Sequence, residues 1–250
     1  MEASTPLTMD HGATCDSECW TDALARDGFT LIPDAVSPSE VERLRAVCAS
    51  LRQQDFAAVR RDSLFGIRRL LTNSPELRAT MAKPPFVSWA RSVLGPAAVP
   101  VYGVFFDKTA GANWPVRWHQ DVAIHAGGTL PVAGYEARPG KDGVAHLLPP
   151  VEVSQQMLAI RIHLDDAPSN HGALRVIPGS HLLGRLSNDA LRHLIDGAQA
   201  VHCEARAGDV MLMRPLLVHA SSPCELPSHR RVVHIEYSAF QLPDGLEWCG

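Results

Sequence analysis

Hydrophobic residues are spaced differently in the two parts of this 250-residue chain. Up to about residue 95 they recur mainly at helical intervals, and glycines close the periodic segments. This pattern predicts helices over residues 20–28, from Pro38 onward and over residues 84–95. A short strand is expected over residues 29–33, between the first two helices.

The second of these helices has the clearest start signal. Ser37 precedes Pro38, and Glu40 follows the serine by three positions, which is the pattern of a capping box. The apolar residues of this helix form a single stripe, made of Val41, Leu44, Val47, Cys48 and Leu51. One face of the helix is therefore expected to pack on the core of the protein.

Beyond residue 100 the hydrophobic residues form short runs rich in branched and aromatic side chains. Turn signals such as Pro178-Gly179-Ser180 and Ala207-Gly208-Asp209 bound most of these runs. The predicted strands cover residues 101–108, 156–164, 201–205, 210–213 and 231–240. Helices followed by many strands predict an α+β fold that is mainly β, with a jelly-roll or cupin-like core and the N-terminal helices packed on one face.

Two segments lack this patterning. Residues 1–17 are polar and are expected to form a disordered N-terminus, which leaves a single domain over residues 18–250. Residues 126–150 are rich in glycine and proline, and a loop of this length inside a compact domain is usually functional. We expect a lid-like insertion there, although a surface insertion without function would have the same composition.

Composition and charge exclude several classes of protein. The net charge of −4 gives no basic surface of the kind that nucleic-acid binding needs. The N-terminus has no basic and apolar leader, and no run of about 18 apolar residues occurs. We therefore expect a cytoplasmic protein, monomeric or homodimeric, with no nucleic-acid partner and no membrane segment.

The six cysteines form no regular disulfide framework. Only Cys15 and Cys19 are close together, and with His11 they lack the second pair of ligands that a structural metal site needs. Reduced, unpaired cysteines are the expectation for this chain.

The most informative short motif is His119-Gln120-Asp121. Its histidine and aspartate are two residues apart in a run that otherwise has the composition of a strand, so their side chains point to the same side. One imidazole and one carboxylate make up two thirds of a facial triad for non-haem iron(II). The tripeptide alone is common by chance, so the prediction depends on a second histidine.

His219 and Arg230 supply what the motif lacks. His219 stands at the end of the mainly apolar run over residues 210–219, and Arg230 follows eleven residues later. A guanidinium binds a carboxylate through two parallel hydrogen bonds, and the Ser221 hydroxyl can add a third. This set suits 2-oxoglutarate, which in one class of iron enzymes chelates the metal and needs an anchor for its distal carboxylate.

Arg231 is the alternative anchor. Neighbouring residues of a strand face opposite ways, so only one of Arg230 and Arg231 can reach the cosubstrate. We assign the anchor to Arg230 and expect Arg231 to be a surface or interface charge.

Taken together, these residues resemble the phytanoyl-CoA dioxygenase family of iron(II)- and 2-oxoglutarate-dependent oxygenases over roughly residues 20–245. The motifs that carry the resemblance are Asp27-Gly28-Phe29, Lys108 eleven residues before His119, His119-Gln120-Asp121, Gly172-Ala173-Leu174, Pro178-Gly179-Ser180-His181 and the span from His219 to Arg230. The resemblance implies a double-stranded β-helix. It also implies an iron site of His119, Asp121 and His219, with Arg230, Ser221 and Lys108 on the side of 2-oxoglutarate.

One departure from the family pattern is informative. Related members often carry a tryptophan near the cosubstrate at the position that Arg161 occupies here, and His163 lies two residues further on the same face. Two cationic groups beside Arg230 need anions to balance them. We hypothesise that Arg161 binds a carboxylate of the cosubstrate or of an acidic substrate. The alternative is that Arg161 and His163 both face solvent.

Other side chains are candidates for binding the substrate. His125 lies four residues beyond Asp121 and would share its side if the strand continued, and Lys141 and His146 lie in the expected lid. We expect His163, His125, His146 and Lys141 to contact the substrate, and His234, which shares the parity of Arg230, to face the interior. His181 is expected to be a structural part of its loop.

The resemblance implies an oxidoreductase that uses iron(II), 2-oxoglutarate and O2 and releases succinate and carbon dioxide. A small, carboxylate-bearing metabolite or natural-product intermediate is the expected substrate, with hydroxylation the simplest outcome and desaturation, epoxidation or cyclisation the others. Halogenases of related architecture carry a small residue at the position of Asp121, which argues against halogenation here. Two alternatives stay open, a cupin-like metal-binding protein without turnover and an iron oxygenase that does not use 2-oxoglutarate.

Overall fold

The computed structural model describes residues 17–51, 57–60, 63–129, 131–141, 144–225 and 228–249. Helix α1 already begins at Ser17, the last residue of the expected disordered segment. The rest of that segment, with His11 and Cys15, lies outside the described residues. None of the helices in the described part of the chain has both the length and the apolar character needed to span a bilayer.

The front of the chain is helical, as predicted. The helices are α1 (Ser17–Asp27), α2 (Pro38–Ser50), α3 (Leu70–Asn73), α4 (Pro75–Met81) and α5 (Phe86–Leu94). Strand β1 (Phe29–Ile32) lies between α1 and α2, where the sequence predicts it. Helices α3 and α4 are not predicted from the sequence, because each is too short to show a helical period.

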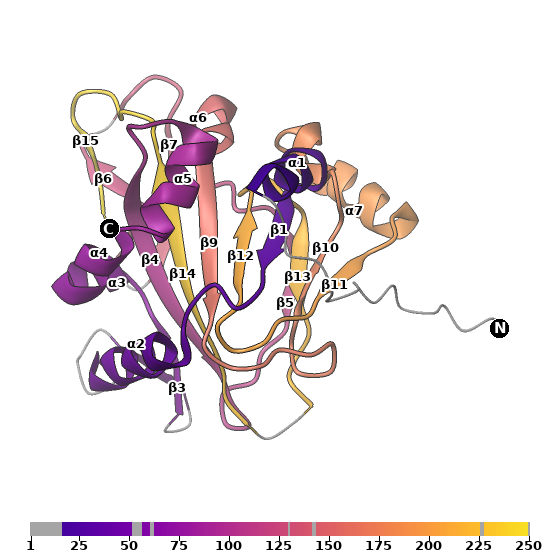
Figure 1. Ribbon diagram of the computed structural model, residues 1–250. Coiled ribbons are helices and arrows are strands. Elements are labelled where there is room, and N and C mark those ends of the chain that lie inside the picture. Colours follow the sequence, from indigo (N-terminus) through magenta and orange to yellow (C-terminus); the bar gives the residue numbers. More distant parts are fainter. Residues whose placement is uncertain are drawn as a thin grey trace.

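Two sheets lie face to face and form a double-stranded β-helix (Figure 1). The major sheet has the order β1-β12-β9-β14-β4-β3-β2, and the minor sheet has the order β11-β10-β13-β5. In the major sheet the strands after β1 are β2 (Ala57–Arg60), β3 (Ser63–Ile67), β4 (Val99–Lys108), β9 (Met157–His163), β12 (Val210–Met213) and β14 (Arg230–Ser238). In the minor sheet they are β5 (Val116–His119), β10 (Leu174–Val176), β11 (Val201–Cys203) and β13 (His219–Ser221). The α+β prediction with a mainly β core is thus confirmed.

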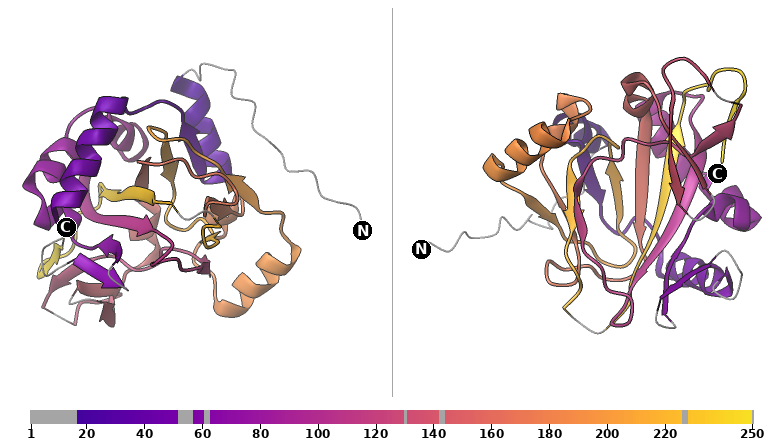
Figure 2. Two further views of the ribbon diagram at one scale, coloured as in Figure 1. Left: turned by 90° about the horizontal axis from the view of Figure 1, so that it is seen from below. Right: turned by 180° about the vertical axis from the view of Figure 1, so that it is seen from behind.

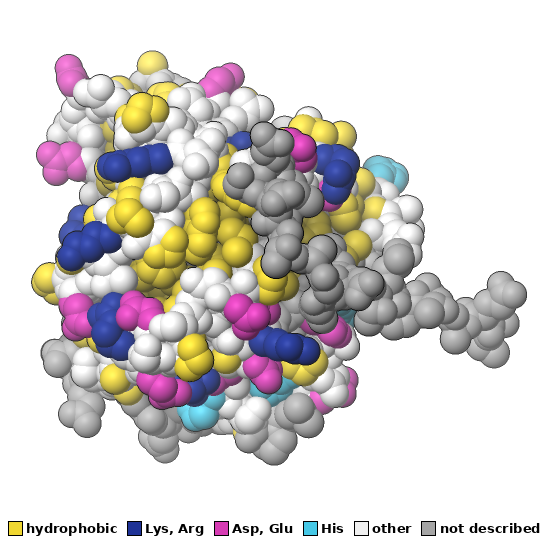
Figure 3. Space-filling view, in the orientation of Figure 1, with side chains coloured by type: hydrophobic (Ala, Val, Ile, Leu, Met, Phe, Trp, Pro, Cys, Tyr) yellow, Lys and Arg dark blue, Asp and Glu magenta, His cyan; other side chains and the backbone are white. Residues whose placement is uncertain are grey.

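Helices cover the outer face of the major sheet. Helices α2 to α5 lie on that side, whereas α7 (Asn188–Gly197) lies beyond the minor sheet (Figure 2). Alternate strand residues such as Ile160, Leu212 and Ile235 pack against the helices in the largest hydrophobic core. The residues between them, such as Ala159 and Met211, face the space between the two sheets. On the face in Figure 3, hydrophobic side chains gather between α1 and α5.

The start of α2 follows the prediction in part. The Ser37 hydroxyl accepts a hydrogen bond from the Glu40 amide at 3.2 Å, and the apolar stripe turns Val41, Leu44 and Cys48 into the core. The Glu40 carboxylate binds Arg43 instead of returning to Ser37. Only half of the capping box forms, because a guanidinium is the stronger partner for a carboxylate.

The segment over residues 126–150 is more ordered than a loop. It contains β6 (Ala126–Gly128), β7 (Glu136–Lys141) and β8 (Val144–Leu148), and α6 (Val151–Gln155) follows. Strands β7 and β8 form a hairpin, and β6 pairs with β15 (Leu246–Trp248). A small core that includes Ile124, Leu147 and Leu246 holds these strands together. Whether the segment closes over the site stays a prediction.

The strand predicted over residues 210–213 is confirmed as β12, which ends at Met213. A separate strand, β13, begins at His219. Pro215 explains the break, because proline cannot donate to a central ladder. The chain turns there, with the Leu217 amide donating to the Arg214 carbonyl at 3.0 Å. The turn moves His219 from the major sheet to the minor sheet.

Candidate functional site

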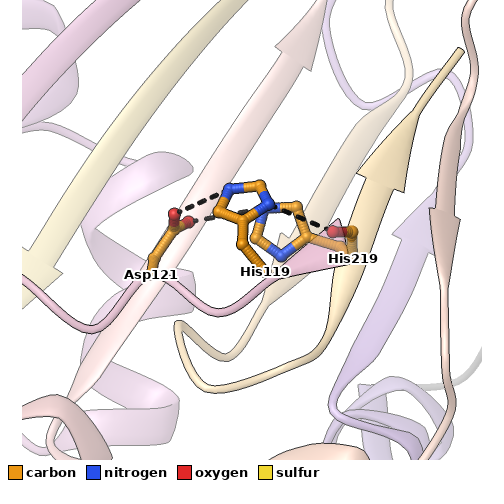
Figure 4. Close-up of side chains that lie close together, drawn as sticks. All are labelled: His119, Asp121 and His219. Carbon is orange, nitrogen blue, oxygen red and sulfur yellow. Dashed lines mark hydrogen bonds and ion pairs between the residues drawn. The ribbon is translucent and has the colours of Figure 1, made fainter. Parts of the chain in front are cut away.

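Strands β5 and β13 bring the two predicted histidine ligands together. His119 ends β5 and lies directly opposite His219, the first residue of β13, in the antiparallel register. Their ring centroids are 4.2 Å apart. The segments are distant in sequence, so only the sheet pairing places the two imidazoles side by side (Figure 4).

Asp121 completes the cluster from outside the strand. The sequence places it on the same strand as His119, but β5 ends at His119 and Asp121 lies in the following loop. Its amide donates to the Pro215 carbonyl at 2.9 Å, which directs its carboxylate back toward the histidines. The carboxylate oxygens lie 3.4 Å from His119 Nε2 and 3.7 Å from His219 Nε2 (Figure 4).

Backbone carbonyls fix the tautomers of both histidines. His119 Nδ1 donates to the Arg117 carbonyl, and His219 Nδ1 donates to the Leu217 carbonyl, each at 2.8 Å. In the neutral form of each ring, Nε2 is therefore the unprotonated nitrogen and can bind a metal, as is usual for histidine ligands. These three residues form a group of ligand atoms all within 4.8 Å of one another, close enough for a single metal ion.

Electrostatics also suit a cation at this position. Burial lowers the pKa of His219 to about 4, so this imidazole is neutral near pH 7. Burial alone would raise the pKa of Asp121, yet the two histidines beside it lower that pKa well below its usual range. A neutral histidine and an ionised aspartate are the states that bind iron(II).

Gln120 fastens the ligand segment to the loop before His219. Its side-chain amide donates to the carbonyls of Leu216 at 2.7 Å and Gly184 at 2.8 Å. Its side-chain oxygen accepts from the Leu186 amide at 2.8 Å. With the side chain buried and bonded at both ends, Gln120 supports the position of its two neighbours.

Arg230 faces the interior of the β-helix and Arg231 faces outward, as predicted. Arg230 is 4% exposed, and its Nε has no hydrogen-bond partner in the described part of the chain. Arg231 makes two hydrogen bonds of 2.7 Å to the Asp165 carboxylate on the outer side. A buried guanidinium with an unpaired N–H is the anchor that a carboxylate ligand needs.

Lys108 lies directly opposite Arg230 in the register of β4 and β14. Its ammonium donates to the Ser221 hydroxyl and, at 2.7 Å, to the Ser222 carbonyl. Burial and then the nearby Arg230 lower the pKa of Lys108 to about 7. The structure thus brings together Lys108, Ser221 and Arg230, with Lys108 positioning the Ser221 hydroxyl.

Arg161 and His163 also face the interior, so the solvent-facing alternative is wrong. They are 6% and 2% exposed. Arg161 Nη1 donates to His234 Nδ1 at 3.1 Å, which shows that His234 faces the interior too. Burial, Arg161 and Arg230 together lower the pKa of His163 to about 3, and neither of its ring nitrogens has a partner among the described residues.

This part of the interior has cations without matching carboxylates. Within the described residues, no ion pair joins Arg161, Arg230 or Lys108 to an acidic side chain. Burying unpaired charges is costly unless a ligand balances them. The arrangement therefore suits an anion that reaches from Arg230 toward the triad.

A second cluster of polar side chains, made of His125, His146 and Glu236, lies at the segment over residues 126–150. His125 stacks flat on Tyr102, with 3.4 Å between the ring centroids, and lies 4.6 Å from the ring of His146. Glu236 is 3.6 Å from His125 Nδ1. His125 and His146 are thus together although β5 does not continue to His125. The side chain of Lys141 lies outside the part of the chain that the structure describes.

Sequence reasoning missed Glu236 and Tyr102. Glu236 lies six positions after Arg230 on β14, and Tyr102 lies six positions before Lys108 on β4. An even spacing along a strand places each of them on the same face as the residue that the sequence did identify. Extending the alternation along β14 and β4 would have found them.

The chain is similar to known proteins in sequence and in fold. The family model for phytanoyl-CoA dioxygenase (PhyH) matches residues 24–232. No curated protein sequence matches the chain.

Several solved structures have a similar fold. SnoK, a non-haem α-ketoglutarate-dependent carbocyclase from nogalamycin biosynthesis, matches with a TM-score of 0.67 and 20% identity, covering 90% of this chain and 84% of that one. AviO1 from Streptomyces viridochromogenes Tue57 matches with a TM-score of 0.69 and 22% identity over 93% of this chain and 99% of that one. EctD from S. alaskensis has been solved with bound Fe and, in another structure, with 2-oxoglutarate and 5-hydroxyectoine. The structure with 2-oxoglutarate matches with a TM-score of 0.68 and 20% identity, covering 92% of this chain and 78% of that one.

At these identities the solved structures support the fold, while the family model covers most of the chain. The chain belongs to the phytanoyl-CoA dioxygenase family of iron- and 2-oxoglutarate-dependent oxygenases.

Proposed function

We propose that this protein hydroxylates a small, carboxylate-bearing metabolite, with conversion of 2-oxoglutarate and O2 to succinate and carbon dioxide. The observation that carries the proposal is the position of three buried cationic groups beside the His119, Asp121 and His219 cluster, with no acidic side chain paired to them among the described residues. A dicarboxylate cosubstrate that also chelates iron matches both features.

Each residue of the site has a distinct role in this proposal. His119, Asp121 and His219 would hold iron(II), which when bound supplies oxygen activation coupled to decarboxylation of the cosubstrate. Arg230 and Ser221 bind the distal carboxylate of 2-oxoglutarate, and Lys108 orients the Ser221 hydroxyl through its hydrogen bond. His163 is buried on the inner face, between Arg161 and Arg230. In this proposal it therefore lies nearer to the cosubstrate than to the lid.

Asp121 bears on the type of reaction. A carboxylate ligand keeps the position that halogenases leave open for chloride, which favours hydroxylation over halogenation. Cyclisation, epoxidation and desaturation diverge from hydroxylation only after hydrogen removal, and SnoK is described as a carbocyclase. We assign hydroxylation as the simplest outcome for this site.

The segment over residues 126–150 is assigned as the lid of a single domain over residues 18–250. His125 and His146 lie at its base, on the side of the interior that is away from Arg230. A lid that packs on its own small core can exclude water while it keeps these two imidazoles against the substrate.

Replacing His119 or Arg230 tests the proposal. His119→Ala should lower succinate release by at least ~100-fold, because one of three iron ligands is lost. Arg230→Ala should raise KM for 2-oxoglutarate by ~30-fold or more, since a buried charge pair is broken. Succinate release from iron(II), 2-oxoglutarate and O2 is the measurement.

Arg231→Ala is the matched control for Arg230→Ala. It should leave KM for 2-oxoglutarate within about twofold and lower the free energy of unfolding by ~1–3 kcal/mol, because only the outer pair with Asp165 is lost. Turnover that depends on His119 but ignores 2-oxoglutarate would contradict the cosubstrate assignment.

Binding of 2-oxoglutarate should depend on pH through Lys108. The free enzyme holds this pKa at about 7, and a bound dianion favours the ammonium form, so binding takes up a proton above pH 7. The dissociation constant should therefore rise above pH 7, by at most about tenfold per pH unit, and stay level below it. Calorimetric titrations of manganese(II)-loaded protein across this range are the measurement. Lys108→Met should remove the dependence, and an unchanged slope in that variant would refute the role of Lys108.

Arg161→Ala tests which carboxylate Arg161 binds. An increase of ~30-fold or more in KM for 2-oxoglutarate would place the cosubstrate on Arg161. In the wild type, amino and carboxylic acids that are substrates should stimulate extra succinate release. If Arg161→Ala loses this stimulation but keeps its KM for 2-oxoglutarate, the substrate binds at Arg161. Products are identified by mass as the gain of one oxygen or the loss of two hydrogens. No change in either property would disprove the hypothesis.

A further inference from the structure

A buried carboxylate lies on the inner face of β14 and has no role in the proposed reaction so far. Glu236 is two residues beyond His234 and faces the same way, and it is 9% exposed. Its oxygens lie 3.6 Å from His125 Nδ1 and 3.9 Å from His234 Nε2, which is longer than a hydrogen bond. The described residues give this carboxylate no hydrogen bond.

The two histidines near Glu236 are each held by another contact. The ring of His234 is held by Arg161, which donates to Nδ1, and the ring of His125 is stacked within 6° of the plane of Tyr102. Burial, Arg161 and other neighbours lower the pKa of His234 to about 3, so it offers no positive charge near pH 7. A buried carboxylate without a hydrogen bond is costly, and a ligand that donates one would relieve the cost.

Arg161 and Glu236 form a pair of opposite charges at a useful spacing. Arg161 lies directly opposite His234 in the register of β9 and β14, so Glu236 is its diagonal neighbour, with Cα atoms about 7–8 Å apart. No ion pair joins them in the described structure, because Arg161 Nη1 is directed at His234. The charges are therefore separate and can bind opposite ends of one small molecule.

We infer that Glu236 binds a cationic nitrogen of the substrate, which makes the substrate a small zwitterion with its carboxylate toward Arg161 and its ammonium toward Glu236. This inference rests on the proposed function and narrows its substrate class. It also assigns Arg161 to the substrate instead of the cosubstrate.

Matched pairs of ligands test the inference by binding alone. The probes are amino acids, including diamino acids, each paired with the compound in which a hydroxyl replaces one amino group. Equilibrium dialysis uses anaerobic protein loaded with manganese(II) and 2-oxoglutarate. The wild type should bind one or more amino members at least ~30-fold more tightly than their hydroxyl partners. Glu236→Gln should reduce that preference to within about threefold.

Two variants separate recognition from a structural effect. Glu236→Asp keeps the charge and should retain the preference for the amino member. Glu247→Gln, at an exposed position of β15, should behave as the wild type. Affinity for 2-oxoglutarate and the midpoint of urea unfolding should be unchanged in Glu236→Gln.

Three results would overturn the inference. They are a wild type that prefers the hydroxyl members, a wild type that binds no amino member, and a Glu236→Gln variant that keeps the preference. In each case, if the wild type releases succinate and His119→Ala abolishes that release, the proposed function itself still holds. Absence of that release in the wild type would count against the proposed function.

Discussion

The pairing of β5 with β13 is the constraint on which the site depends. It sets His119 opposite His219 in an antiparallel register, and a slip of one residue would turn either imidazole to the other face of the sheet. The loop before β13 is held in place from two sides. The Gln120 side chain binds the Leu216 carbonyl, and the Ser180 hydroxyl accepts from the Val218 amide at 2.8 Å. Asp121 then needs only the hydrogen bond from its backbone amide to the Pro215 carbonyl to complete the triad.

Strand β14 carries the other functional groups in order. Arg230, His234 and Glu236 face the interior from alternate positions, and Arg161 faces them from β9. Positive charge is concentrated toward Arg230, and negative charge lies at Glu236, at the opposite end of the strand. In the proposed function this order separates the cosubstrate from the substrate, because a rigid ladder holds each side chain at a fixed spacing.

The sequence was sufficient to predict the groups that its local patterns define. Strand parity distinguished Arg230 from Arg231, and the spacing of motifs identified His119, Asp121 and His219. The sequence could not define features that depend on tertiary contacts. His125 faces the interior because it stacks on Tyr102, not because β5 continues to it. The hairpin within residues 126–150 packs on Leu246, which is about 100 residues away, so glycine and proline content alone suggested a loop.

Diffraction from anaerobic crystals soaked with iron(II) and 2-oxoglutarate, with anomalous data at the iron edge, tests the central assignment most directly. We expect one anomalous peak, with His119 Nε2, His219 Nε2 and the Asp121 carboxylate as the protein ligands of the metal. The distal carboxylate of 2-oxoglutarate should lie against Arg230 and Ser221. A peak at any other group of residues, or a distal carboxylate bound at Arg161, would contradict the assignment.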